Sequence, residues 1–186
     1  RPRGMELLPY TVGRARYVRP LDTSNPFTKT SDKDYRLGGD LKYRLTSNLT
    51  LNATFNPDFG QVEVDPAVVN LSAFETFFSE KRPFFIEGNE LLTGRGQSFI
   101  GRPSWFYSRR IGAPPRGVAS GDFVDTPAYT TIASAAKVTG RLASGLSIGA
   151  LAAITPREYA HTFDTTTAVT EQVAVEPPSS FGVLRL

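Results

Sequence analysis

Residues 36–57, RLGGDLKYRLTSNLTLNATFNP, decide the fold because apolar and polar residues alternate through most of the stretch. A period of two is the pattern of a β-strand with two unlike faces. The polar turn Thr46-Ser47-Asn48 divides the stretch, which predicts a hairpin of two strands of about ten residues each. One face carries Leu37, Leu41, Tyr43, Leu45, Leu49, Leu51 and Phe55, and the other carries Asp40, Lys42, Arg44, Asn52 and Thr54.

The same pattern recurs at residues 131–155, with a turn at Ala143-Ser144-Gly145. Its expected apolar face consists of Ile132, Ala136, Val138, Leu142, Leu146, Ile148, Ala150, Ala152 and Ile154. Weaker alternation predicts strands over residues 6–18, 168–176 and 181–186. We therefore expect an all-β chain of roughly six or seven strands.

Two architectures fit these hairpins. An ordinary antiparallel sheet has one apolar face on a core and one face in water. A membrane-spanning β-strand needs about 9–11 residues and carries its apolar residues outward and its polar residues inward. The length of the predicted strands favours the second, a portion of an antiparallel transmembrane β-barrel with long strands and hairpins.

Residues 58–128 differ in character and predict an insert with a short helix and an Arg-rich loop. Asp65-Pro66 is a candidate helix start, and a capping box at Ser72 and Glu75 supports a helix through Phe78. Residues 83–86 are predicted to be a brief extended run, and residues 94–121 an irregular loop. We expect this insert to pack inward, on the polar side of the sheet.

Charge within the insert is divided into an acidic part and an arginine-rich part. Residues 58–90 hold seven acidic residues, whereas residues 95–116 hold five arginines and no acidic residue. Because buried charges persist when paired, these groups predict an interior charge network. Its members are Asp58, Glu63, Asp65, Glu80, Arg82, Glu87, Arg109 and Arg110. A glycosidase carboxylate pair and a Ca²⁺ site are the alternatives, but no calcium-loop motif is present.

Few residues are available for other chemistry. The chain has no Cys and one His, so thiol nucleophiles, Cys-based zinc sites and His-rich metal sites are excluded. His161 and Thr165-Thr166-Thr167 are predicted to lie in a solvated loop. The net charge is +3, but the acidic block interrupts the basic segments and argues against a nucleic-acid surface. No catalytic residue, cofactor or metal is predicted.

One long stretch also carries a family resemblance. It runs from Asn56-Pro57-Asp58-Phe59-Gly60-Gln61 through Asn70-Leu71-Ser72-Ala73-Phe74-Glu75 to Lys81-Arg82-Pro83-Phe84-Phe85-Ile86-Glu87-Gly88, followed by Phe106-Tyr107-Ser108-Arg109-Arg110-Ile111-Gly112. This series resembles a family of large Gram-negative outer-membrane proteins of unassigned function, in which a β-barrel domain follows a carbohydrate-binding family 9 type domain. Gly38–Tyr43 and Val175-Glu176-Pro177 fit the same family, while Ser79 and Pro178 depart from it.

The resemblance implies that residues 1–186 are the N-terminal part of an outer-membrane barrel, with the carbohydrate-binding domain and the rest of the barrel outside this chain. It implies a channel or receptor-like role with outer-membrane lipid, and by association glycans, as partners. It supplies no catalytic residues. A soluble glycan-binding β-sheet module and a carboxylate-dependent glycoside hydrolase are the alternative functions.

Overall fold

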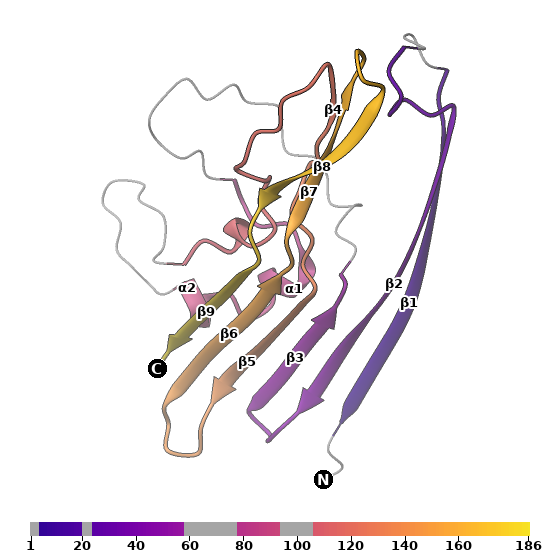
Figure 1. The fold of residues 1–186 in the computed structure, drawn as a ribbon. Helices are drawn as coiled ribbons and strands as arrows, with labels where there is room; N and C mark the ends of the chain where they lie inside the picture. The colour runs from indigo at the N-terminus through magenta and orange to yellow at the C-terminus, as the bar shows by residue number, and fades with distance from the viewer. Residues whose placement is uncertain (1–3, 20–23, 58–77, 94–105) are drawn as a thin grey trace.

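The computed structural model describes residues 4–19, 24–57, 78–93 and 106–186. Within these ranges the chain is almost entirely strand, turn and loop, which confirms the all-β prediction (Figure 1). The strands are β1 (Met5–Tyr17), β2 (Ser31–Arg44), β3 (Leu49–Phe55), β4 (Phe123–Asp125), β5 (Ser134–Arg141), β6 (Ser147–Thr155), β7 (Glu158–Asp164), β8 (Val169–Glu176) and β9 (Ser179–Arg185). The short helices are α1 (Pro83–Ile86), α2 (Glu90–Thr93) and the 3₁₀ turn η1 (Ser108–Arg110).

The strands form two antiparallel sheets. A six-stranded sheet has the order β1-β2-β3-β5-β6-β9, and a three-stranded sheet has the order β4-β7-β8. The larger sheet is open within the described residues, with β1 and β9 as its edges. None of the helices in the described ranges has the length and apolar character needed to cross a membrane.

The deciding hairpin, residues 36–57, forms as predicted. Leu41 pairs with Ala53 and Lys42 with Asn52, so the apolar and polar sets lie on opposite faces of β2 and β3. The two strands differ in length, with 14 residues in β2 and 7 in β3. β2 is longer because β1 pairs with its whole length, from Tyr43 opposite Met5 to Ser31 opposite Tyr17.

The second hairpin is also confirmed, but three residues of its expected apolar face, Ile132, Leu142 and Leu146, lie outside the strands. Ala136 pairs with Ala152 and Val138 with Ala150, which puts these apolar residues on the face that carries Leu41. Ile132 was expected on that face, but it is buried in the core with 4% of its surface exposed. It lies before β5 begins at Ser134, so the strand alternation does not govern its direction.

The prediction of six or seven strands is wrong, because β4 and β7 were missed. Residues 158–164, expected as loop, form β7, whose buried positions hold only small residues, Ala160 and Thr162. That face lacks the large apolar residues by which alternation is recognised. β7 follows β6 and β8 precedes β9, so the pair β7–β8 continues the pair β6–β9. The hydrogen-bond ladder is interrupted between the two pairs at Pro156 and Pro177-Pro178, because proline has no backbone N–H to donate.

The chain before β4 lies along β8. The backbone N–H of Gly117 donates to the carbonyl oxygen of Val175 at 2.8 Å, and the Arg116 guanidinium pairs with Glu176 at 2.6 Å. A side chain at position 117 would meet the Val175 oxygen at 2.5 Å, so this approach requires glycine. The end of the predicted insert is therefore attached to the sheets.

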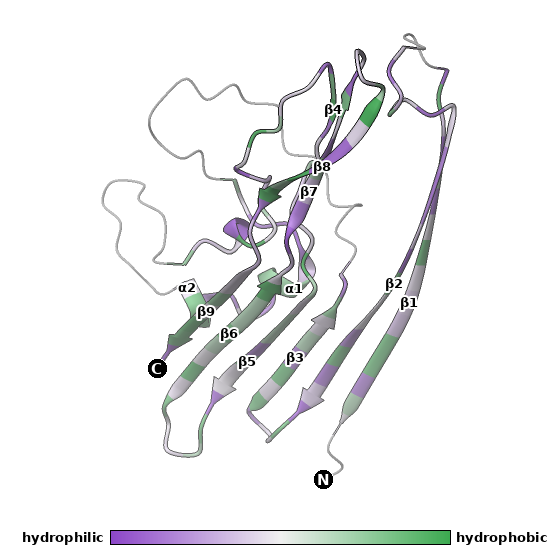
Figure 2. Cartoon of the chain, viewed as in Figure 1, coloured by the Kyte–Doolittle hydropathy of each residue, from purple (hydrophilic) through white to green (hydrophobic). Residues whose placement is uncertain are grey.

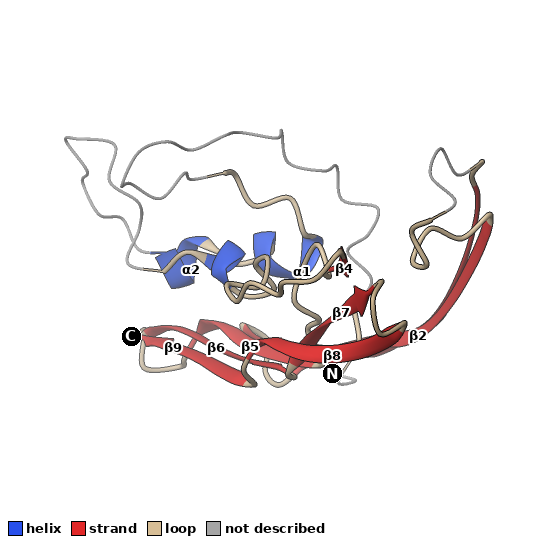
Figure 3. Ribbon diagram, turned by 45° about the horizontal axis from the view of Figure 1, so that its top comes forward, coloured by secondary structure: helices blue, strands red, loops and turns tan. Residues whose placement is uncertain are grey.

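The described part of the insert covers one face of the large sheet (Figure 3). Residues 83–86, expected to be extended, form α1, which begins with proline at its first turn and is closed by bonds from Ile86 and Glu87 back to Arg82 and Pro83. Residues 65–77 of the predicted helix lie outside the described residues, and Phe78, its expected last residue, is not helical. Insert and sheet share one core of Phe85, Leu92, Ile111, Ile132, Ala135, Leu151 and Ala153.

Hydrophobic and hydrophilic residues alternate along the strands of the six-stranded sheet (Figure 2), and the register puts them on opposite faces. We call the face under the insert the inward face and the other the outward face. The pairing of these six strands contains no bulge, so the register assigns every strand residue to one face. Lys33 is the one charged residue of the six strands on the outward face. The inward face holds Glu6, Arg14, Arg16, Asp32, Asp34, Arg36, Asp40, Lys42, Arg44, Lys137, Arg141 and Arg185.

Candidate functional site

The candidate site is the contact between the inward face and the insert. At its centre lies Lys137 of β5, a charged side chain with 1% of its surface exposed. Its ammonium donates to the backbone carbonyl oxygens of Phe84 and Glu87 and lies 4.9 Å from the centre of the Phe84 ring. Because a buried ammonium requires acceptors, Lys137 holds the carboxyl end of α1 on the sheet.

A second lysine of the sheet reaches the same turn of the insert. The Lys42 ammonium, on β2, lies 2.6 Å from a carboxylate oxygen of Glu87. Both side chains are about half exposed, so this pair contributes less than about 1 kcal/mol on its own. Together the two lysines attach α1 to β2 and to β5.

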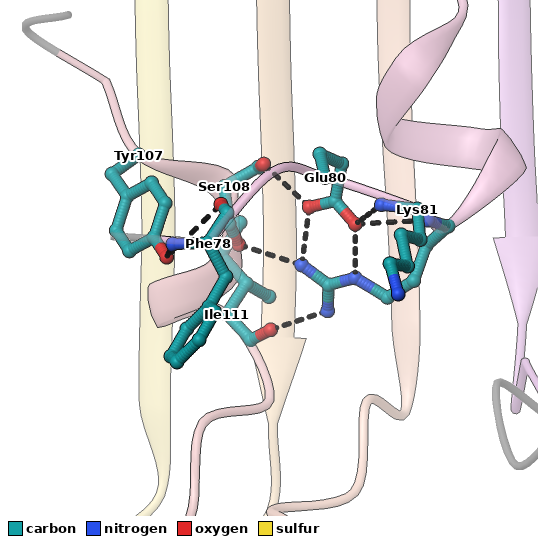
Figure 4. A network of polar contacts seen from close by, with 7 residues as sticks. Phe78, Glu80, Lys81, Tyr107, Ser108 and Ile111 are labelled. Atoms are coloured by element: carbon teal, nitrogen blue, oxygen red, sulfur yellow. Dashed lines mark hydrogen bonds and ion pairs between the residues drawn. The ribbon is translucent and has the colours of Figure 1, made fainter. Parts of the chain in front are cut away.

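Within the insert, Glu80 and Arg82 form a buried ion pair (Figure 4). The Arg82 Nη2 and Nε atoms donate to the two carboxylate oxygens at 2.7 and 2.8 Å, a bidentate arrangement. The Glu80 carboxylate also accepts from the Ser108 hydroxyl and from the backbone N–H groups of Lys81 and Arg82. One of its oxygens therefore accepts three hydrogen bonds and the other accepts two.

The remaining donors of Arg82 join two distant segments of the insert. Nη1 donates to the carbonyl oxygen of Ile111 at 2.6 Å, and Nη2 donates to that of Ser108 at 2.9 Å. Beside them, the Tyr107 hydroxyl accepts from the backbone N–H of Phe78 at 2.8 Å (Figure 4). These contacts, named here the Glu80–Arg82 cluster, hold the chain around residue 80 against η1.

The electrostatics of this cluster disfavour acid catalysis by Glu80. Burial alone raises the pKa of this carboxyl, but hydrogen bonds and charge from Arg82, with the Ser108 hydroxyl, outweigh burial and lower the pKa below its ordinary value. A glycosidase acid requires a raised pKa. Glu80 is therefore ionised and fully engaged at neutral pH, which suits a structural role.

The structure places the residues of the predicted charge network as follows. Glu80 and Arg82 are paired, and Glu87 contacts Lys42 of the sheet rather than an arginine. The Arg109 guanidinium lies 5.8 Å from the centre of the Phe78 ring, and Arg110 is the exposed end of η1. The predicted members Asp58, Glu63 and Asp65 lie outside the described residues, so the eight-residue network stays a prediction.

The contacts that the sheet makes with the insert were not predicted from the sequence. Lys42 and Lys137 were assigned to the polar faces of their strands, but their contacts with the insert were not predicted. Ser108 was also missed, although it stands next to Arg109 in the stretch that carries the resemblance. A polar residue at an inward position of a strand is the signal that could have identified both lysines.

The described residues contain no group of three or more His, Asp or Glu side chains that could hold a metal ion. The chain belongs to a protein family described as a domain of unknown function (DUF5916), whose model matches residues 2–186. The comparisons with curated proteins and with solved structures found no match to this chain. Family membership thus covers nearly the whole chain and carries no assigned activity.

Proposed function

We propose that this chain is part of an outer-membrane β-barrel domain, with the outward face of the six-stranded sheet against lipid and the insert on the interior side. The protein would act as a channel or receptor in the outer membrane of a Gram-negative bacterium. The distribution of charge carries the proposal. Lys33, the third residue of β2, is the single charged residue of the six strands on the outward face.

The exposed side chains of the outward face favour contact with lipid over contact with water. Large apolar residues of the outward face are widely exposed across the sheet, including Leu7 at 65%, Phe55 at 61% and Leu184 at 66%. A soluble sheet covered on one side turns its apolar face to the cover and its charges to water. The arrangement here is the reverse, which favours the membrane protein over a soluble glycan-binding module.

Strand length and the open edges are consistent with the proposal. β1 and β2 have 13 and 14 residues and β6 has 9, against the roughly 9–11 that a tilted strand needs to cross a bilayer. A sheet edge in lipid leaves backbone groups without partners. The proposal therefore includes strands outside this chain that pair with β1 and β9.

The functional role itself comes from the resemblance described above. It supports a channel or receptor-like protein, and the link to glycans rests on the neighbouring carbohydrate-binding domain of similar proteins. The glycoside hydrolase alternative gains nothing from Glu80, which Arg82 and Ser108 occupy.

Side-chain accessibility tests which face meets lipid. Because the chain has no Cys, single variants Leu41→Cys and Asp40→Cys take one label each at adjacent positions on opposite faces of β2. In vesicles of brominated phosphatidylcholine, a fluorescent label at position 41 should be quenched strongly and one at position 40 weakly. Ala152→Cys is the matched control on β6 and should behave as Leu41→Cys does. Equal quenching at 40 and 41, or the reverse order, would contradict the proposal.

A further inference from the structure

Strand β1 has one side without a strand partner in the part of the chain that the structure describes (Figure 1). The backbone N–H of Arg44 donates to the carbonyl oxygen of Gly4 at 3.0 Å, and that of Val18 donates to the oxygen of Thr30 at 3.0 Å. Both pairs follow the register of β1 and β2, so the even-numbered residues of β1 bond to β2. The backbone groups of its odd-numbered residues therefore point away from β2, toward the free side.

The free side of β1 is divided by a proline. Pro9 has an odd number and no N–H, so a strand laid along the free side loses one hydrogen bond there. After Pro9, residues 11–17 form an uninterrupted stretch, named here the edge stretch. Its donors and acceptors on the free side belong to Thr11, Gly13, Ala15 and Tyr17. An antiparallel strand of the same length bonds to all four residues.

The edge stretch carries positive charge on the inward face. Arg14 lies opposite Asp34, but the Asp34 carboxylate is paired at 3.0 Å with Arg36 of its own strand. Arg16 lies opposite Asp32, and no ion pair joins these two side chains. The three arginines exceed the two aspartates by one charge, and the arginines of β1 are the ones beside the free side.

On the outward face the edge stretch is uncharged. Thr11, Gly13, Ala15 and Tyr17 lie on that face, and 71% of the Tyr17 surface is exposed. Cross-strand neighbours of opposite charge stabilise a sheet, and like charges destabilise it. The strand that fits the edge stretch therefore has acidic residues on its inward face and apolar residues on its outward face.

A second copy of the chain does not meet this requirement. Two antiparallel copies of residues 11–17 that overlap fully bring the two Arg14 side chains opposite each other. Because like charges directly opposite are destabilising, the charge of the edge stretch disfavours its own copy as the partner.

We propose that residues 11–17 of β1 pair with an antiparallel strand that carries acidic side chains beside Arg14 and Arg16 and apolar side chains on the outward face. This inference rests on the proposed function, which includes a strand beside β1, and adds the chemistry of that strand and the stretch to which it bonds. Main-chain hydrogen bonds provide the affinity, and the arginines select acidic strands over basic ones.

Fluorescence anisotropy of a labelled peptide tests the pairing with the 186-residue chain in zwitterionic detergent. The probe is the blocked peptide Val-Glu-Val-Glu-Val-Glu-Val, whose glutamates match the inward positions and whose valines match the outward positions. We expect it to bind about fivefold more tightly than the analogue with glutamine in place of glutamate. The same peptide with N-methyl groups on its valines keeps its charge but loses the donors that face β1, and it should not bind.

The double variant Arg14→Gln/Arg16→Gln should weaken binding of the glutamate peptide about fivefold and remove its advantage over the glutamine peptide. Arg44→Gln/Arg157→Gln removes the same charge from two exposed residues outside the edge stretch and is the matched control, with unchanged affinity expected. Circular dichroism of each variant checks that the strands are retained. Equal affinities for the glutamate and glutamine peptides, or binding of the N-methylated peptide, would overturn the proposal.

This titration and the quenching experiment on positions 40 and 41 can fail separately, because peptide binding in detergent does not depend on which face meets lipid. Quenching as expected together with no peptide binding would overturn the strand pairing alone. Peptide binding as expected together with reversed quenching would overturn the membrane orientation alone.

Discussion

The carboxylate of Glu80 contacts Ser108 and orients the Arg82 donors toward the carbonyl oxygens of Ile111 and Ser108. The side chains of Glu80 and Arg82 are only 8% and 10% exposed. Removing one member of such a pair leaves a buried charge without compensation.

Glu80→Gln should therefore lower the free energy of unfolding by about 3–5 kcal/mol at neutral pH. Denaturant titration in detergent micelles measures this change. Glu90→Gln, at an exposed glutamate of the same insert, should change stability by less than about 0.5 kcal/mol. Equal effects of the two substitutions would show that the Glu80–Arg82 cluster does not stabilise the fold.

The lowered pKa of Glu80 also predicts how stability changes with pH. A carboxyl whose pKa is lower in the folded state stabilises the fold above its ordinary pKa of 4.5. This contribution is lost as the pH falls below that value and through the lowered pKa of the folded protein. The stability difference between wild type and Glu80→Gln should be constant from pH 7 to pH 5 and should shrink below pH 4.5. A difference that grows on acidification would contradict this assignment.

At the scale of elements, α2 reaches β6 where the strand has a glycine. A Cβ atom at Gly149 would lie 2.5 Å from the carbonyl oxygen of Leu91, closer than any relaxed contact. Gly149→Ala should therefore push α2 away from the sheet and lower stability by about 1–3 kcal/mol.

Gly182→Ala on β9 is the matched control, since nothing lies within 4 Å of a Cβ atom there. Its expected effect on stability is below about 0.5 kcal/mol. The same denaturant titration compares the two variants. A Gly149→Ala variant as stable as Gly182→Ala would mean that α2 moves aside at no cost.

For the whole molecule, the polarity of the two faces predicts the effect of a charge placed on the outward face. Leu41→Arg should lower the stability of the protein folded in lipid vesicles by about 2–4 kcal/mol, if residue 41 lies near the bilayer midplane. Val169→Arg, at an exposed position of β8 outside the six-stranded sheet, should cost less than about 0.5 kcal/mol. No difference between the two variants would favour a sheet surrounded by water.

The open sheet predicts how the isolated 186-residue chain behaves. In the part of the chain that the structure describes, the edge strands β1 and β9 each lack a strand partner on one side, and the outward face exposes apolar side chains. Such edges and patches promote association in water. Analytical ultracentrifugation should find oligomers or aggregates in buffer and a smaller species in detergent. A stable monomer in detergent-free buffer would contradict the prediction.

Much of the sheet could be predicted from local pattern. Alternation over residues 36–57 and 131–155 indicated both hairpins and the apolar residues of the strands that share one face. The expected members that fell outside the strands are Leu45, Ile132, Leu142 and Leu146. Side chains of a strand alternate with a period of two whatever the strand packs against, so this information is contained in neighbouring residues. β7 escaped detection because Ala160 and Thr162, on its buried face, are too small to make a strong pattern.

By itself the sequence determined which residues share a face of the sheet, because strand geometry is local. That the insert covers the polar face was expected from the sequence. Only the tertiary structure decided that Leu151 and Ala153 of that face join the core, and that Lys137 ends on the carbonyl groups of α1. These contacts join segments about 50 residues apart, such as Lys137 and Glu87. Their formation depends on how the chain returns over the sheet, and no periodicity along the sequence records that path.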